Sequence, residues 1–273
     1  MVFHKHIPKF PLDNYIDCII YLEGNNKGTG FPKTAMSMVF NLNDNFRLFT
    51  DKGFTNFIDY KKHWVAGFQT QPTYVESYGE SKMIVIQFKT LGAYIFLHQP
   101  LRHFTEHYID LDCIFNKEAD EIWEQLKETN TVNEKFLIAE NFLYRKLLTH
   151  KIPNEKLIAS INSILNNKAT VSITAICLQH NISRKHLNFL FQEYLGISPK
   201  MLSSLNRFQT ILQSISRSRP DNLTHFAYDL DFFDQAHFNN NFKRFTGIKP
   251  NDYIKNVIVQ PSLRIIPHFL PVG

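Results

Sequence analysis

The spacing of apolar positions changes along the chain, and with it the expected kind of element. Up to about residue 115, short apolar runs alternate with turn residues. Residues 35–42 alternate as a half-buried strand does, and residues 83–88 are typical of a more buried one. Turn signals at 43–45 and 51–53 lie between them. Short strands with frequent turns predict a small β-barrel or sandwich, of the cupin-like kind.

From residue 117 the spacing becomes helical. Residues 117–128 and 133–149 place apolar side chains three or four positions apart, and Pro153 ends the second of these helices. Further helices are expected at 155–166, 172–179, 184–195, 200–216, 223–230, 235–246 and 250–256. The fold class is therefore α+β. The expected parts are a β-rich domain (1–130), a connecting helix (131–153), an all-α domain (154–256) and an extended tail (257–273).

The all-α domain contains one unit twice. The stretch F-Q-E-Y-L-G-I-S-P at 191–199 returns as F-K-R-F-T-G-I-K-P at 242–250, with a constant offset of 51 residues. In each copy a short helix, a tight turn and a second helix form a helix-turn-helix. Ser183 and Asp234 are the expected N-caps of the second helices, and the glycine of each copy is the expected C-cap. Asn154 and Asn222 are expected N-caps of other helices.

The face opposite the apolar stripe of each second helix is rich in amides and cations. Such side chains can form paired hydrogen bonds with adenine and guanine edges. The basic surplus of the chain lies in the same region. Residues 154–256 carry 12 Lys and Arg against 7 Asp and Glu, whereas residues 1–153 carry 17 Lys and Arg against 18 Asp and Glu. A basic surplus beside the repeated unit suits a polyanionic partner.

Residues 155–256 resemble the DNA-binding domain of the AraC family of bacterial transcription regulators. The family pattern of the second unit is matched at Phe232 to Phe238, Phe242, Lys243, Gly247, Pro250 and Tyr253. The resemblance implies two helix-turn-helix units joined by a long helix, whose second helices enter successive major-groove segments of double-stranded DNA. Asp231 stands where the family usually has a turn glycine, and Cys177 where it usually has alanine.

The resemblance also implies roles for individual side chains. Base contacts are expected from Lys185, Asn188, Gln235, Asn239 and Asn240. Phosphate contacts, which fix the register on the duplex, are expected from Arg184, Lys243 and Lys249. Phe189 falls where the first unit often has a base-reading arginine, so this unit is expected to distinguish less sequence than the second.

Residues 8–128 resemble, more loosely, the β-rich domain that precedes this unit in one AraC-type subfamily. The matching positions are Phe31-Pro32, Phe40-Asn41, 67–72, 86–93 and Leu111. By analogy the domain binds a small-molecule effector or mediates self-association. Its aromatic residues could line a pocket or fill the core: Phe40, Phe68, Tyr74, Tyr78, Phe88 and Tyr94. The helix at 133–149 carries more apolar positions than one packing face needs, which predicts a homodimer element.

Other classes of site are less favoured. His98, His103 and His107 cluster but lack the H-x-H spacing of a cupin metal site, so neither a metal nor a cofactor is expected. No nucleophile elbow, H-E-x-x-H or phosphate-binding loop is present, which argues against an enzyme. No apolar run reaches the roughly 18 residues of a membrane span, and three distant cysteines are typical of a reduced, cytoplasmic protein.

The sequence therefore predicts a cytoplasmic, sequence-specific DNA-binding transcription regulator, activator or repressor, controlled through its N-terminal domain by a signal or by self-association. The first alternative is an architectural, nucleoid-associated protein that binds DNA without sequence preference. The second is an enzyme with an accessory helical domain.

Overall fold

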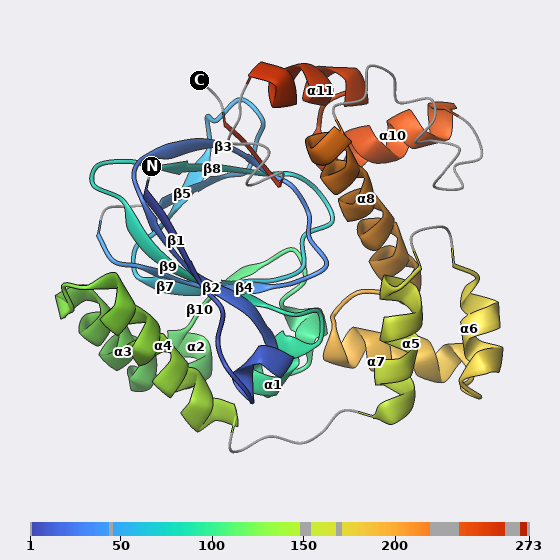
Figure 1. The fold of residues 1–273 in the computed structure, drawn as a ribbon, viewed down its shortest axis with the longest axis horizontal. Helices are drawn as coiled ribbons and strands as arrows, with labels where there is room; N and C mark the ends of the chain where they lie inside the picture. The colour runs from blue at the N-terminus through green and yellow to red at the C-terminus, as the bar shows by residue number, and fades with distance from the viewer. Residues whose placement is uncertain are drawn as a thin grey trace.

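The protein combines a curved β structure with helices beside it, as the computed structural model in Figure 1 shows. The structure describes residues 2–43, 46–147, 154–167, 171–218, 235–259 and 268–271. The strands are β1 (Val2–His6), β2 (Ile16–Glu23), β3 (Asn26–Gly30), β4 (Ser37–Asn41), β5 (Phe46–Phe49), β6 (Phe57–Tyr60), β7 (His63–Ala66), β8 (Thr73–Ser77), β9 (Lys82–Phe88), β10 (Tyr108–Asp110) and β11 (Phe269–Pro271). The expected α+β class is confirmed.

The strands form two antiparallel sheets that curve around a common interior and are called the barrel below. One sheet has the order β1-β2-β9-β4-β7-β10, and the other has the order β11-β3-β8-β5-β6. The second sheet therefore contains β11, which comes from the C-terminal end of the chain and pairs with β3. In Figure 1 this strand is the dark red arrow beside the blue and cyan strands.

Both faces of the first sheet are apolar, because helices cover its outer face. Side chains alternate along a strand, so Met38 of β4 faces outward into the main core while its neighbour Val39 faces the barrel interior. On β9 the same alternation sends Ile84 outward and Met83 inward. A strand that is buried on both faces cannot show a simple apolar–polar pattern.

The outer face of that sheet is covered by short helices and by two longer ones. They are η1 (Leu12–Asn14), α1 (Gly92–Leu97), η2 (Leu101–His103), α2 (Asp112–Phe115), α3 (Lys117–Glu128) and α4 (Val132–Leu147). The bounds of α3 are those expected. Phe142 of α4 packs edge-to-face on Phe40 of β4 with 6.4 Å between ring centroids, and Glu140 accepts a hydrogen bond from His6 Nε2 at 3.0 Å. These contacts hold α4 against the barrel.

The remaining helices follow the expected pattern closely. They are α5 (Glu155–Leu165), α6 (Ile173–Gln179), α7 (Arg184–Tyr194), α8 (Pro199–Ser218), α10 (Gln235–Thr246) and α11 (Pro250–Val259). Asn154 caps α5 as expected, because its Oδ1 accepts a hydrogen bond from the Lys156 amide at 2.8 Å. α11 runs three residues beyond its expected end. The expected helix at 223–230, the caps Asn222 and Asp234, and Asp231 lie outside the described residues.

The two units dock on the barrel at separate places. The first, α6–α7, meets α1 and η2: Tyr94 and Tyr194 pack with ring centroids 4.2 Å apart, and Thr105 Oγ1 donates to the Gly196 carbonyl at 2.7 Å. In the second unit, α10 and the helix α11 that follows it meet the loop after β3, where Phe31 packs edge-to-face on Tyr253 at 5.8 Å. One apolar core runs through the barrel helices and both units. In the described part of the chain, every helix is too short or too polar to cross a bilayer.

Candidate functional site

The helix α7 leaves its N-terminal half exposed and buries its C-terminal end. Its start is fixed by Ser183, whose Oγ accepts a hydrogen bond from the His186 amide at 3.2 Å, as expected of an N-cap. Arg184, Lys185 and Asn188 are exposed in the first two turns. Because the docking contacts involve only the far end of the helix, these three side chains share an accessible face.

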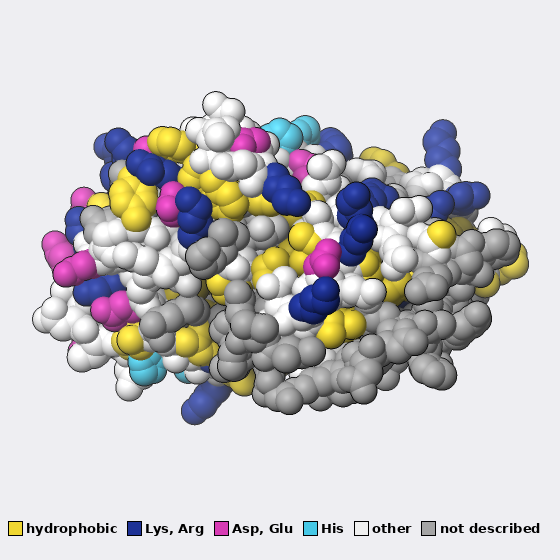
Figure 2. Space-filling view, turned by 90° about the horizontal axis from the view of Figure 1, so that it is seen from above, with side chains coloured by type: hydrophobic (Ala, Val, Ile, Leu, Met, Phe, Trp, Pro, Cys, Tyr) yellow, Lys and Arg dark blue, Asp and Glu magenta, His cyan; other side chains and the backbone are white. Residues whose placement is uncertain are grey.

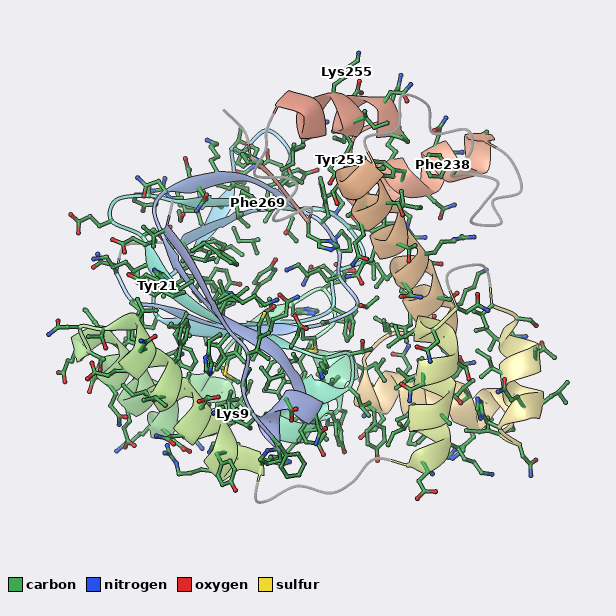
Figure 3. All side chains as sticks on the ribbon, in the orientation of Figure 1. Lys9, Tyr21, Phe238, Tyr253, Lys255 and Phe269 are labelled. Atoms are coloured by element: carbon green, nitrogen blue, oxygen red, sulfur yellow. The ribbon has the colours of Figure 1, made fainter. Side chains whose placement is uncertain are left out.

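The helix α10 repeats this arrangement in the second unit. Asn239, Asn240 and Lys243 are exposed, as is Lys249 in the turn that follows. The opposite side of the helix is buried, and Phe242 packs on Phe208 of α8 with 5.8 Å between ring centroids. Figure 3 shows Phe238 on this inner side. Gln235 is the first residue of α10, but its side chain lies outside the described part.

The two exposed faces differ in one respect that the sequence predicted. Phe189 on α7 is 57% exposed, and its ring lies nearly parallel to that of His186 at 6.3 Å. The first unit therefore presents an apolar surface where the second presents Asn240. A phenyl ring can contact a thymine methyl group but cannot hydrogen-bond with a base edge.

Positive charge gathers on the helical part of the molecule. Figure 2 shows Lys and Arg side chains over that part with few acidic ones among them, whereas both signs are mixed over the barrel. Lys243, Arg244, Lys249 and Lys255 are all exposed on α10, α11 or the turn between them. Such a surface suits a phosphate backbone.

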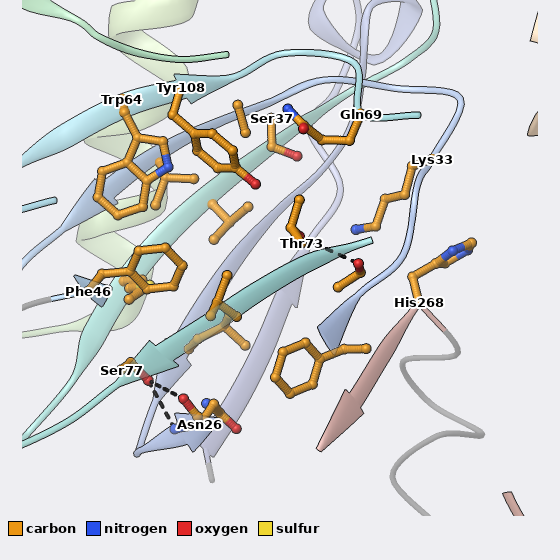
Figure 4. Close-up of a pocket in the computed structure, with 18 of the residues that line it drawn as sticks. Asn26, Lys33, Ser37, Phe46, Trp64, Gln69, Thr73, Ser77, Tyr108 and His268 are labelled. Atoms are coloured by element: carbon orange, nitrogen blue, oxygen red, sulfur yellow. Dashed lines mark hydrogen bonds between the residues drawn. The ribbon is translucent and has the colours of Figure 1, made fainter. Parts of the chain in front are cut away.

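The barrel encloses a cavity of about 290 Å³ between its two sheets. This volume lies near the lower end of the range for small-molecule pockets. Most of its wall is apolar: Leu22, Phe31, Val39, Phe46, Trp64, Val75, Met83, Val85, Tyr108 and Phe269. Figure 4 shows Trp64 and Phe46 at one end, with Lys33 and His268 at the other.

The end with Lys33 and His268 is the polar end of the cavity. Burial lowers the pKa of Lys33, although the charges of Cys18 and Asp17 oppose this effect. Burial and the charge of Lys33 together lower the pKa of His268 to about 3, so its imidazole is neutral at physiological pH. His268 Nδ1 has no hydrogen-bond partner among the described residues. Lys33 and His268 thus lie at one end of a mainly apolar cavity, which polar side chains such as Ser37, Gln69 and Thr73 also line.

The aromatic residues singled out in the sequence do not line this cavity. Phe40, Phe68 and Phe88 are fully buried in the core. Tyr94 instead docks the first unit, and Tyr74 lies beside Gly247 of the second. Sequence reasoning missed the true lining, including Lys33 and His268. The one feature of the sequence that could have pointed to the cavity is Lys33, a single lysine between Phe31-Pro32 and an apolar strand.

One group of side chains in the described residues brings potential metal ligands together. His63, Asp112 and Asp120 have ligand atoms within 4.8 Å of one another. Lys62 Nζ lies 2.6 Å from Asp120 Oδ1, and this contact raises the pKa of Lys62 and lowers that of Asp120. The lysine already supplies the positive charge that balances the carboxylates. His98, His103 and His107 form no such group in the described part.

Two family models match separate parts of the chain. Residues 176–256 match a family described as a helix-turn-helix domain, and residues 4–110 match a domain of unknown function, DUF6597. The first match covers both α7 and α10 with their exposed faces. None of the curated proteins matches the chain.

Several solved structures are similar to this chain at low identity. ToxT from Vibrio cholerae is 13% identical over 93% of this chain and 98% of its own, with a TM-score of 0.47. ToxT bound to (E)-4-(8-methylnaphthalen-1-yl)but-3-enoic acid is 14% identical over 94% and 100%, with a TM-score of 0.47. The AraC-like transcriptional activator CuxR is 14% identical over 78% and 86%, with a TM-score of 0.31.

A helix-turn-helix domain whose helices α7 and α10 expose amide and cationic side chains, on a basic surface, defines a DNA-binding transcription regulator. Its N-terminal domain is the β-rich domain of unknown function. The match to a helix-turn-helix domain at residues 176–256 agrees with the helix-turn-helix units expected from the sequence.

Proposed function

We propose that the protein acts in the cytoplasm by reading one DNA site in two successive major-groove segments, with α7 in one and α10 in the next. The observation that carries this proposal is that α7 and α10 each expose polar side chains on their N-terminal halves: Lys185 and Asn188 on α7, and Asn239 and Asn240 on α10. In helix-turn-helix proteins, residues in the first turns of the second helix contact base edges. Binding to DNA, without a catalytic step, is the whole of the proposed activity.

The second unit is proposed to supply most of the specificity. Asn239 and Asn240 can each form a paired hydrogen bond with adenine, while Lys185 and Asn188 contribute from the first unit. Gln235 belongs to the same proposed set. Arg184, Lys243 and Lys249 are proposed to contact phosphates, because they are exposed cations on these helices or in the turn after α10.

Selection of bound sites from a random DNA pool tests the proposal directly. We expect one recurring site that survives competition by excess random DNA at several salt concentrations. An architectural protein would yield no such site, because its binding rests on phosphate contacts alone. That result would overturn the proposal.

Asn240→Ala and Lys243→Ala form a matched pair on one helix. Asn240→Ala should weaken the selected site by roughly 1–3 kcal/mol and relax specificity at about one base pair. Lys243→Ala should weaken all sequences alike and reduce the slope of log affinity against log salt by about one. Both are measured by competition binding over a salt series. An equal loss on all sequences for Asn240→Ala would show that Asn240 does not read a base.

The barrel cavity is proposed to hold the signal. An apolar wall that ends at Lys33 suits a small, mainly apolar molecule with one anionic group. An anion beside Lys33 would favour the charged ammonium and so offset the effect of burial on its pKa. Self-association is the second proposed route of control, through the exposed side of α4, and the protein is proposed to act as a homodimer.

A further inference from the structure

The C-terminal strand β11 is built into the wall of the N-terminal barrel. Phe269, Leu270 and Pro271 pair antiparallel with Gly30, Thr29 and Gly28 of β3. The Phe31 amide also donates a hydrogen bond to the His268 carbonyl at 2.7 Å. Without β11, the edge of β3 would expose unpaired backbone groups.

The strand β3 is shaped to receive β11. A Cβ atom at Gly28 would lie 2.3 Å from the carbonyl oxygen of Leu270 and 2.7 Å from Phe269 Cζ. Any side chain at this position would therefore displace β11. Leu270 is only 9% exposed, so the docked strand also buries apolar surface. The absence of a side chain at Gly28 is a requirement of this docking.

The docked strand reaches the cavity as well as the sheet edge. His268 and Phe269 both line the cavity, at the end that holds Lys33. In Figure 4, His268 lies next to Lys33, on the segment that enters β11. The part of the chain that follows the DNA-binding domain thus supplies one wall of the proposed effector site.

A second contact joins this wall to the DNA-binding domain. Phe31 lines the cavity and packs edge-to-face on Tyr253 of α11 at 5.8 Å. Tyr253 is fully buried and packs in turn on Phe242 of α10 at 5.7 Å. The first unit docks at Thr105, which does not itself line the cavity.

We propose that β11 couples the cavity to the second helix-turn-helix unit: a molecule in the cavity stabilises the docked strand and, through Phe31 and Tyr253, holds α10–α11 on the barrel. This inference rests on the proposed role of the cavity as the effector site. Coupling of this kind is reciprocal, so displacing β11 must weaken binding in the cavity by the same factor.

The test uses 8-anilinonaphthalene-1-sulfonate, an apolar anion, as the probe. Its affinity is measured by fluorescence titration, and docking of β11 is measured by NMR hydrogen exchange at the Phe31 amide. In the wild-type protein, we expect saturating probe to slow this exchange. Gly28→Ala should speed the exchange and raise the Kd of the probe about five-fold or more.

Gly30→Ala is the matched control. It adds the same methyl group to the same strand, but next to Thr73 Oγ1 at 2.8 Å and away from the tail, so the slow exchange of Phe31 should remain. Because Gly30 also lines the cavity, this variant is compared by exchange alone. A chain that ends at Pro267 keeps Gly28 and removes β11, and it must reproduce the effects of Gly28→Ala. This second variant covers the case in which Gly28→Ala fails to fold.

The proposal is overturned if the wild-type protein does not bind the probe, or binds it with no change in Phe31 exchange. It is equally overturned if loss of β11 leaves the affinity unchanged. Competition binding to the selected DNA site, measured on the same wild-type sample, distinguishes failure of this inference from failure of the proposed function. A specific DNA complex without coupling removes only this inference, whereas the lack of a specific complex removes the proposed function.

Discussion

Gly196 and Gly247 occupy equivalent positions in the two copies of the repeat, yet they meet different surroundings. Both have a backbone φ in the left-handed region, +79° and +73°, and both end their helices as the sequence predicted. A Cβ atom at Gly196 would lie 2.3 Å from the backbone oxygen of Leu101. At Gly247 the nearest atom is the Tyr74 hydroxyl, at 3.3 Å. The glycine of the first unit thus ends a helix and also allows close docking.

Alanine at these two positions separates the cost of the backbone conformation from the cost of docking. Gly247→Ala should lower the free energy of unfolding by about 1–2 kcal/mol, because a Cβ atom disfavours the left-handed conformation. Gly196→Ala should lower it distinctly further, because the Leu101 backbone cannot move aside as the Tyr74 side chain can. Urea unfolding midpoints of the two full-length variants measure the difference. Equal losses would show that docking at Gly196 does not contribute.

The exposed residues of α7 and α10 show what local sequence determines. Apolar spacing and caps fix which side of a helix is buried, so the exposure of Lys185, Asn188, Asn239 and Asn240 follows from a few neighbouring residues. The cavity-lining residues could not be found in this way. Lys33 and Trp64 line one cavity only after the two sheets have closed, and no local pattern predicts that closure.

At the scale of elements, the helices were more predictable than the strands. The bounds of α3 and α10 agree with those expected, since helical hydrogen bonds join residues four apart. β11 has only three residues, and its partner β3 lies at the other end of the chain. Its sequence contains a proline and no alternation, so an extended tail was the most that could be expected there.

Docking of β11 should depend on pH through His268. Its pKa is about 3 in the folded protein, because of burial and the nearby charge of Lys33, against about 6.5 in an unfolded chain. Between these values the unfolded state binds a proton that the folded state does not, so stability falls as the pH is lowered below about 6.5. The docked strand should loosen over the same range.

His268→Gln removes this proton site and provides the comparison. Urea midpoints at pH 7.5 and pH 5 should fall further for the wild-type protein than for His268→Gln, because only the wild-type chain gains a proton on unfolding at this position. An equal fall for both proteins would mean that His268 is accessible to protons in the folded state.

At the scale of the whole molecule, α4 leaves an apolar surface uncovered. Leu137 is 56% exposed and Tyr144 is 46% exposed, and their spacing of seven residues places them on one side of the helix. If this surface pairs with a second copy, the protein should have twice the chain mass of 32.0 kDa at micromolar concentration. Sedimentation equilibrium measures this mass, and a monomer would contradict the dimer.

A double variant tests whether α4 makes the contact. Leu137→Ser with Tyr144→Ser should shift the equilibrium toward monomer, because burial of these side chains would supply the association energy. Leu178→Ser is the control, since Leu178 is 78% exposed but lies on α6. A selected DNA site with two half-sites would independently indicate a dimer.

The pairing of β11 with β3 also means that the barrel can be completed only at the end of synthesis. Chains grow from the N-terminus, and domains generally fold in that order during synthesis. β3 emerges early, but the strand that covers its edge is made only after both helix-turn-helix units. Throughout that interval the barrel has an open edge and an incomplete cavity. If the cavity holds the effector, as proposed, a nascent chain binds it fully only after both proposed DNA-binding units have been made.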